Sequence, residues 1–244
     1  MTFAARQTQL GPLDCTIVDD GDQPNALVVI CHGYGAPGTD LVPLAGEWIS
    51  LLGDRARNVR FVFPSAPNSL AEIGMPGGRA WWPINMAQLM NAVEAEKFEE
   101  LHTHQPPGID TARDALSETI NAAIAQLDAP EPTLVLGGFS QGAMLTMDTT
   151  LRGHIAAPEV LIQFSGTLVC ESQWQQNITR LENSVVYQSH GSVDPVLPYA
   201  SAQSLHELIC TGRSDAKFHS FYGPHTIDPA SLTATAELIR NSIA

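Results

Sequence analysis

The sequence predicts an α/β protein in which a mostly parallel central sheet carries helices on both faces. Short apolar runs rich in β-branched residues alternate along the chain with longer segments of helical spacing. This alternation is typical of strand–helix–strand units that build a parallel sheet. Residues 26–31 (ALVVIC) are apolar throughout, as expected of a strand that is covered on both faces. At 244 residues the chain can bury one substantial core, so we expect residues 1–244 to form a single domain.

The first part of the chain supplies three of the expected strands. Residues 14–19 (DCTIVD) alternate as a short strand, and residues 26–31 form the next one. Thr39 or Asp40 is placed to cap a helix that runs to about residue 52. Residues 59–63 (VRFVF) then return to the sheet, so the order is strand, helix, strand.

The regular alternation resumes after residue 107 and continues to the end of the chain. In this part of the chain a helical segment is followed by a strand four times, and a final helical segment ends the sequence. We expect strands at 134–136, 159–164, 184–189 and 217–222, and helices at 109–127, near Trp174, at 198–210 and at 231–242.

Residues 64–107 interrupt the pattern with a long connection rich in proline, glycine and aromatic residues. It encloses one amphipathic segment, residues 86–101. A connection of this length within a compact domain is usually functional or disordered. Trp81 and Trp82 favour a functional insertion, a lid or a pocket wall in which both contact the substrate. A pair of ordinary core aromatics and a contact in a homodimer are the alternatives.

Composition excludes several classes of protein. Hydrophobic residues make up 44% of the chain and charged residues 16%, which suits a globular enzyme. The net charge is −14 and only 12 lysines and arginines are present, so we expect no nucleic-acid partner and no adsorption to anionic membranes.

The N-terminal residues, the length of the apolar runs and the cysteines indicate the cellular compartment. The first ten residues (MTFAARQTQL) lack the basic and apolar regions of a secretory signal, and no apolar run is long enough to span a bilayer. We therefore expect a cytoplasmic protein with no stable membrane insertion. Cys15, Cys31, Cys170 and Cys210 are scattered without a C-x-x-C pair, which favours free thiols in a reducing compartment.

Ser140 lies at the centre of the most informative stretch, residues 133–147 (TLVLGGFSQGAMLTM). A strand-like run reaches a tight turn, and apolar residues resume afterwards at helical spacing. A serine at such a turn has strained backbone angles and crowded surroundings. The positions two residues before and after it should therefore lack a side chain, as Gly138 and Gly142 do. The helix N-terminus there can stabilise developing negative charge. The pattern G-x-S-x-G predicts a nucleophile, against the alternative of an ordinary N-cap serine.

A serine hydroxyl needs a base to accept its proton and an acid to orient that base. Asp194 follows the strand at 184–189, and His225 follows the strand at 217–222 on a loop that contains Gly223 and Pro224. The carboxyl ends of parallel strands meet at one edge of the sheet, so Ser140, Asp194 and His225 are expected to form a catalytic triad. The alternatives are a helix-capping aspartate and a surface histidine.

Other ionisable residues fit these roles less well. Asp148 falls on the helix after Ser140, and Asp228 is too close to His225 in sequence to occupy another strand end. His190 shares a turn with Asp194, where packing or hydrogen bonding is the expected role. The remaining candidate bases lie on helices, inside a strand or in the long connection: His154, His206, His219, His102 and His104.

Two backbone donors are needed for an oxyanion hole. Gln141, directly after the nucleophile, supplies one N–H group. Tyr34, in the loop His32-Gly33-Tyr34-Gly35 after an early strand, supplies the second, because the glycines let the backbone approach a ligand. His32 leaves a buried strand directly, so we expect it to be structural.

Several of these motifs together resemble the phospholipase/carboxylesterase family of α/β hydrolases, which includes bacterial carboxylesterases and acyl-protein thioesterases. The likeness runs from residue 27 to the C-terminus, and its most specific parts are the G-F-S-Q-G-A elbow and the H-G-x-x-D-P-V-x-P box. It implies the α/β-hydrolase fold and a cofactor-independent serine hydrolase that acts on esters or thioesters of small to medium acyl chains. The motifs that carry it are CHGYGAPGTDLVPLA, FPSAPNS, GGRAWWPIN, GGFSQGAML, SHGSVDPVLP and YGPHTI, in that order.

The chain departs from the family pattern on the side that is expected to bind the acyl group. The usual Trp-Phe-Asp box reads Trp81-Trp82-Pro83, and residues 85–107 are longer than in compact members. Pro224 replaces the glycine that usually precedes the histidine. The triad residues are unaffected, so the departures bear on which substrate is bound.

We expect hydrolysis through an acyl-enzyme, without metal or cofactor. Amide cleavage or perhydrolysis on the same triad and a non-catalytic small-ligand binding module on the same fold are the alternatives. A metal hydrolase that uses His102 and His104 is disfavoured, because no carboxylate or cysteine lies nearby at ligand spacing.

Overall fold

The computed structural model describes residues 2–21, 23–95 and 97–243, and it confirms the α/β-hydrolase architecture. The strands form one eight-stranded sheet in the order β1-β2-β4-β3-β7-β8-β9-β10. Pairing is antiparallel from β1 through β2 to β4 and parallel across the rest. The strands are β1 (Ala4–Leu10), β2 (Leu13–Asp19), β3 (Ala26–Cys31), β4 (Val59–Pro64), β7 (Thr133–Phe139), β8 (Val160–Phe164), β9 (Val185–Gly191) and β10 (Lys217–Phe221).

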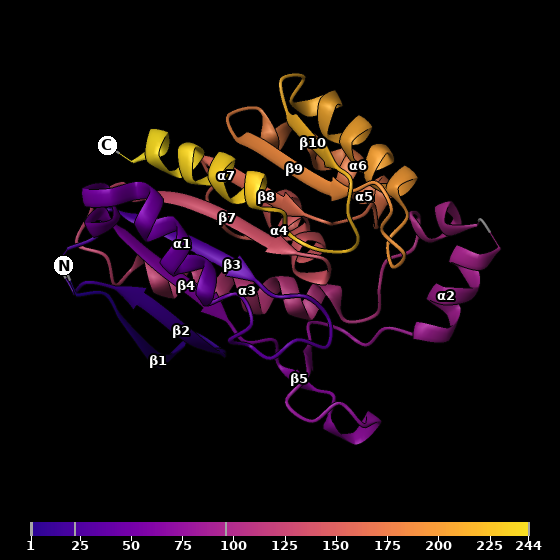
Figure 1. The fold of residues 1–244 in the computed structure, drawn as a ribbon, viewed down its shortest axis with the longest axis horizontal. Helices are drawn as coiled ribbons and strands as arrows, with labels where there is room; N and C mark the ends of the chain where they lie inside the picture. The colour runs from indigo at the N-terminus through magenta and orange to yellow at the C-terminus, as the bar shows by residue number, and fades with distance from the viewer. Residues whose placement is uncertain (1, 22, 96, 244) are drawn as a thin grey trace.

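Helices cover both faces of the sheet (Figure 1). The helices α1 (Pro43–Leu52) and α7 (Pro229–Ser242) pack on one face, where Trp48 Nε1 donates a 3.1 Å hydrogen bond to Thr235 Oγ1. The other face carries α3 (Ile109–Ile124), α4 (Gln141–Arg152), α5 (Glu171–Asn177) and α6 (Tyr199–Gly212). Every residue of β3 is buried because its alternate side chains enter two separate hydrophobic cores.

Two local expectations differ from the structure. Strand β1 was not predicted, because its sequence (AARQTQL) is mostly polar. All of its residues except Thr8 and Leu10 are exposed, as suits an edge strand. The expected capping by Thr39 or Asp40 is wrong. Helix α1 begins at Pro43, whose fixed φ suits the first helical turn, and Val42 occupies the N-cap position without a side-chain hydrogen bond.

The long connection contains short elements at the carboxyl ends of the parallel strands (Figure 1). A two-stranded ribbon, β5 (Asn68–Ser69) and β6 (Arg79–Ala80), flanks the 3-10 turn η2 (Ala71–Ile73). The amphipathic segment at 86–101 is divided into helix α2 (Met86–Glu94) and the 3-10 turn η3 (Phe98–Leu101), and residue 96 between them lies outside the described residues. Asn85 caps α2 by accepting a 3.0 Å hydrogen bond from Gln88 N.

Candidate active site

Ser140 occupies a sharp turn between β7 and α4. Its backbone angles are φ 56° and ψ −119°, which a residue with a side chain rarely adopts. A Cβ atom on Gly138 would lie 2.4 Å from the carbonyl carbon of Gly142, and one on Gly142 would lie 2.1 Å from the oxygen of Cys31. The predicted need for two glycines around this serine is therefore confirmed.

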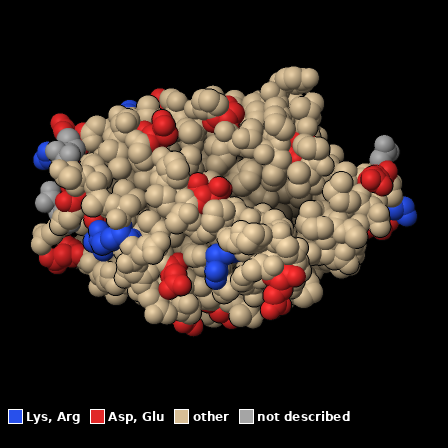
Figure 2. All heavy atoms as spheres, turned by 60° about the horizontal axis from the view of Figure 1, so that its bottom comes forward, with Lys and Arg blue, Asp and Glu red and all other residues tan. Residues whose placement is uncertain are grey.

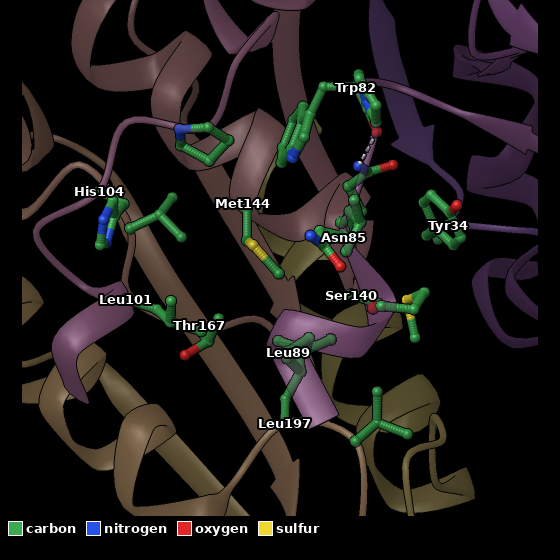
Figure 3. A pocket seen from close by; sticks show the side chains of 18 of the residues that line it. Tyr34, Trp82, Asn85, Leu89, Leu101, His104, Ser140, Met144, Thr167 and Leu197 are labelled. Carbon is green, nitrogen blue, oxygen red and sulfur yellow. Dashed lines mark hydrogen bonds between the residues drawn. The ribbon is translucent and has the colours of Figure 1, made fainter. Parts of the chain in front are cut away.

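The two residues expected to donate backbone N–H groups line the cavity of Ser140 from different elements. Gln141 is the first residue of α4, and it lines the same cavity as Ser140. Tyr34 lies in the loop after β3 and lines that cavity too (Figure 3). A Cβ atom on Gly33 would come within 3.3 Å of Ser140 Cβ, so the loop approaches the nucleophile closely. Within the described part of the chain neither Gln141 N nor Tyr34 N donates a hydrogen bond. Both amides are free to bind a ligand oxygen.

Asp194 and His225 are hydrogen-bonded to each other. His225 Nδ1 lies 2.6 Å from Asp194 Oδ2, and Asp194 Oδ1 accepts from the backbone N–H groups of Val196 (2.8 Å) and Leu197 (2.9 Å). Burial alone raises the pKa of Asp194, but hydrogen bonds from His190 and His225 outweigh burial and hold that pKa well below its usual range. The alternative of a helix-capping aspartate is wrong, since α6 begins after Pro198 without a side-chain cap.

The loop that carries His225 is fixed from several directions. The Phe139 ring lies 4.7 Å from the His225 ring between centroids, and His225 lines the cavity that contains Ser140. Ser165, whose φ of 47° is also strained, donates a 3.1 Å hydrogen bond from Oγ to Thr226 O. Val193 N donates to Gly223 O at 3.2 Å, so the loops that carry Asp194 and His225 are bonded together. Ser165 was missed from the sequence, where its only signal is a place directly after a strand.

The cavity beside Ser140 has a volume of about 570 Å³ and mostly apolar walls. Figure 3 shows Leu89 and Leu101 of the long connection and Met144 of α4 turned toward it. Among the described residues that line it there is no lysine or arginine, and Asp40 is the one carboxylate. Such a cavity suits an uncharged, apolar group.

The two tryptophans have different positions. Trp82 lines the cavity, as expected of a substrate-binding residue. Trp81 does not: it is 1% exposed and lies behind the wall, where its Nε1 donates a 2.9 Å hydrogen bond to His32 O. The expectation that Trp81 contacts the substrate is therefore wrong: Trp81 is a core residue whose indole N–H already has a hydrogen-bond acceptor.

Gln141 has a second set of contacts that sequence reasoning missed. Its buried side chain accepts from Trp81 N at 2.9 Å and donates to Trp82 O at 2.8 Å. The residue after the nucleophile thus binds the start of the cavity wall to the catalytic turn. A glutamine at a buried helix start is the only sequence signal for this role.

The other histidines lie away from the nucleophile or have structural partners. His32 is buried and accepts from Ala66 N at 3.1 Å through Nε2, and burial lowers its pKa, which agrees with the expected structural role. His102 contacts Ser201 Oγ at 2.9 Å, and His104 Nδ1 lies 2.9 Å from Glu100 O. Residues 2–21, 23–95 and 97–243 contain no group of three or more His, Cys, Asp or Glu side chains arranged to hold a metal ion.

The four cysteines are free, as expected, and Cys15, Cys31 and Cys170 are buried. Burial raises the pKa of Cys15 and of Cys170 to about 12, so these thiols are unreactive. Across the described residues, no helix has both the length and the hydropathy required to cross a membrane.

Ser140 lies on a strained strand-to-helix turn and shares its cavity with a histidine that is bound to a carboxylate. This arrangement is typical of a serine hydrolase of the α/β-hydrolase class. Comparison with known proteins gives the particular family. Residues 13–243 match the model of the phospholipase/carboxylesterase family, so the chain belongs to that family and is a hydrolase of esters or thioesters.

Individual relatives agree with this assignment. Acyl-protein thioesterase 1 of Kluyveromyces lactis is 30% identical over 197 residues, which cover 77% of this chain and 78% of the relative. The protein of the same name from Eremothecium gossypii is 27% identical over 224 residues, 88% of this chain and 87% of the relative. Among solved structures, esterase PE8 has a TM-score of 0.73 and 26% identity, covering 99% of this chain and 100% of that one. Acyl-protein thioesterase 2 of Zea mays, at 19% identity and a TM-score of 0.60 over 94% and 99% of the two chains, shows the shared fold alone.

Proposed function

We propose that this enzyme cleaves uncharged carboxylic esters or thioesters of small to medium acyl chains through an acyl-enzyme on Ser140. The observation that carries the proposal is the 2.6 Å hydrogen bond between His225 Nδ1 and Asp194 Oδ2 beside an apolar cavity that also contains Ser140. With Nδ1 held by the carboxylate, Nε2 of the same imidazole is left to accept the serine proton.

The reaction has two steps. Ser140 Oγ attacks the acyl carbon while His225 Nε2 takes its proton, and the N–H groups of Gln141 and Tyr34 bind the oxyanion. His225 then protonates the leaving alcohol or thiol. Water, deprotonated by His225, attacks the acyl-enzyme and releases the acid. Asp194 stays ionised throughout, which agrees with the lowered pKa of its carboxyl group.

The acyl group binds under the insertion formed by residues 64–107. Trp82, Leu89 and Leu101 contribute apolar surface from this segment, and Met144 contributes it from the nucleophile helix. The volume of about 570 Å³ falls within the usual range for small-molecule pockets. We treat residues 1–244 as one domain in which 64–107 form the acyl-pocket wall.

The surroundings favour a small, uncharged substrate in a reducing compartment. Acidic side chains outnumber basic ones on the face shown in Figure 2, in line with the net charge of −14 and against a nucleic-acid partner. The free cysteines support a cytoplasmic location. The homodimer stays a prediction that solution mass measurement would test.

A chain-length series of p-nitrophenyl esters from acetate to palmitate, run beside a palmitoyl thioester, tests the proposal. We expect the highest kcat/KM on an ester of medium length. A preference for the thioester would support the second candidate, a thioesterase, which the names of the relatives favour. Anilide hydrolysis or peracid formation exceeding ester hydrolysis would assign the triad to another acyl transfer. Absence of turnover on every substrate would contradict catalysis and favour a binding module.

A further inference from the structure

His190 lies at the end of β9, is completely buried, and contacts the carboxylate of Asp194. Its Nε2 lies 2.9 Å from Leu197 O and 3.2 Å from Asp194 Oδ2. Both neighbours are acceptors, so Nε2 carries the hydrogen. For Nδ1, which is also buried, the described residues provide no hydrogen-bond partner.

The partners of its two ring nitrogens bear on which form of His190 the site can hold. A protonated ring would bury an Nδ1–H group without an acceptor, which is costly. The neutral ring with hydrogen on Nε2 leaves only an unpaired lone pair at Nδ1. The surroundings therefore favour the neutral Nε2–H form.

The same contacts complete the environment of Asp194. Its Oδ1 accepts two backbone N–H groups, and its Oδ2 lies between the imidazoles of His225 and His190. The two rings approach one oxygen from different strand ends, since His190 belongs to β9 and His225 follows β10. A carboxylate held in this way cannot rotate without losing several hydrogen bonds.

We propose that His190 is a positioning residue for the proposed triad: as a neutral donor it fixes Asp194 Oδ2 toward His225 and leaves the carboxylate its full negative charge. The inference rests on the proposed function. During acyl transfer His225 becomes an imidazolium, and the charge of Asp194 stabilises it. A cationic His190 would offset that charge, whereas a neutral one fixes the acceptor without doing so.

Gln188 offers a matched comparison on the same strand. It is also completely buried, lies two residues before His190 and so projects from the same face of β9. Its Nε2 donates a 2.8 Å hydrogen bond to Ala202 O of α6, as His190 donates to Leu197 O just before that helix. Among the described residues, the hydrogen bonds of Asp194 do not involve Gln188. Gln188→Leu therefore removes a comparable buried hydrogen bond while it spares the triad.

The test compares His190→Leu, His190→Gln and Gln188→Leu for kcat, KM and the pH dependence of kcat/KM on one p-nitrophenyl ester. We expect His190→Leu to lower kcat by roughly 10- to 100-fold with little change in KM, the scale typical of removing an outer partner of a functional side chain. The acidic limb of its profile should move to higher pH, because Asp194 Oδ2, without the N–H donor of His190, accepts more strongly from His225 and stabilises its imidazolium form. His190→Gln keeps an N–H donor near the Nε2 position and should restore most of the loss. Gln188→Leu should keep wild-type kcat and profile.

Equal losses in His190→Leu and Gln188→Leu, with an unmoved acidic limb, would overturn the inference and leave His190 a packing residue. Nitrogen NMR of the wild-type enzyme adds a direct check: we expect the Nε2–H form of His190 to persist across the pH range in which activity appears. A protonated His190 in that range would contradict its neutral role. Ser140→Ala in the same assay separates the two proposals. If it is inactive while His190→Leu is unaffected, only the inference on His190 fails.

Discussion

The two sides of the cavity are built differently. On the catalytic side, the Asp194 side chain is completely buried and that of His225 is 15% exposed, and hydrogen bonds from neighbouring loops hold both. On the opposite side, none of the nine residues of α2 is buried, and Met86 and Met90 are 41% and 43% exposed. Proton transfer demands fixed geometry, whereas apolar binding tolerates movement. We therefore expect the side that carries Asp194 and His225 to determine kcat, and the side formed by α2 to determine which substrate is preferred.

Gln141 joins the two sides. It lines the cavity beside Ser140, and its side chain forms hydrogen bonds with the backbone of Trp81 and Trp82 at the root of the insertion. The wall is thus fixed where it meets the nucleophile and exposed farther away, at α2. Substitutions on either side should separate the two functions.

The largest effect is expected from Ser140→Ala. Removing the nucleophile should lower kcat on a p-nitrophenyl ester by on the order of 10⁶-fold, as in other triads. The far-ultraviolet circular dichroism and the melting temperature should stay near wild type, since the hydroxyl caps no helix. Unchanged turnover would exclude this nucleophile.

Asp194→Asn should come next. The amide cannot hold His225 in the tautomer that accepts the serine proton, so kcat should fall by about 10⁴-fold. A few-fold loss would place the orienting acid elsewhere and would break the assignment of rate to this side of the cavity. The loss of kcat is measured by steady-state kinetics with the best ester of the chain-length series.

Leu89→Ala should show a smaller and selective effect. Leu89 lines the cavity from α2, so its truncation should raise KM for an octanoate ester by about 3- to 10-fold, in keeping with the value of one or two buried methylenes. KM for acetate and kcat for both esters should change little. Met90→Ala, on the same helix but outside the cavity lining, is the matched control. A fall in kcat for Leu89→Ala would show that the two sides are not independent.

Asp19 tests whether a buried, hydrogen-bonded carboxylate acts only on stability when it is remote from the cavity. It is 2% exposed and binds Arg6 at 2.5 Å and Arg60 at 2.8 Å. Burial raises its pKa, but the hydrogen bonds and charges of the two arginines outweigh burial and lower it. The stabilisation is therefore present above an unfolded-state pKa of about 3.9 and is lost as the pH falls through the lower folded value.

Asp19→Asn should reduce the free energy of unfolding by about 1–3 kcal/mol at neutral pH and leave kcat/KM unchanged. Urea titrations should show the difference from wild type shrinking as the pH falls below about 4. A difference that does not vary with pH would contradict an ionic origin.

The sequence was informative where local chemistry determines structure. The elbow around Ser140 requires glycines at fixed spacing, and parallel strands bring Asp194 and His225 to one edge of the sheet. It was uninformative where a residue acts through distant contacts. The side chain of Gln141 meets residues about 60 positions away, and nothing around Trp81 indicates that its indole N–H is satisfied by His32.

Covalent labelling tests the central claim most directly. Wild-type enzyme treated with a fluorophosphonate, digested and mapped by mass spectrometry, should carry one phosphonyl group on Ser140, and Asp194→Asn should acquire it far more slowly. Labelling at another serine, or an unlabelled wild-type enzyme, would contradict the assignment of Ser140 as a nucleophile activated by His225.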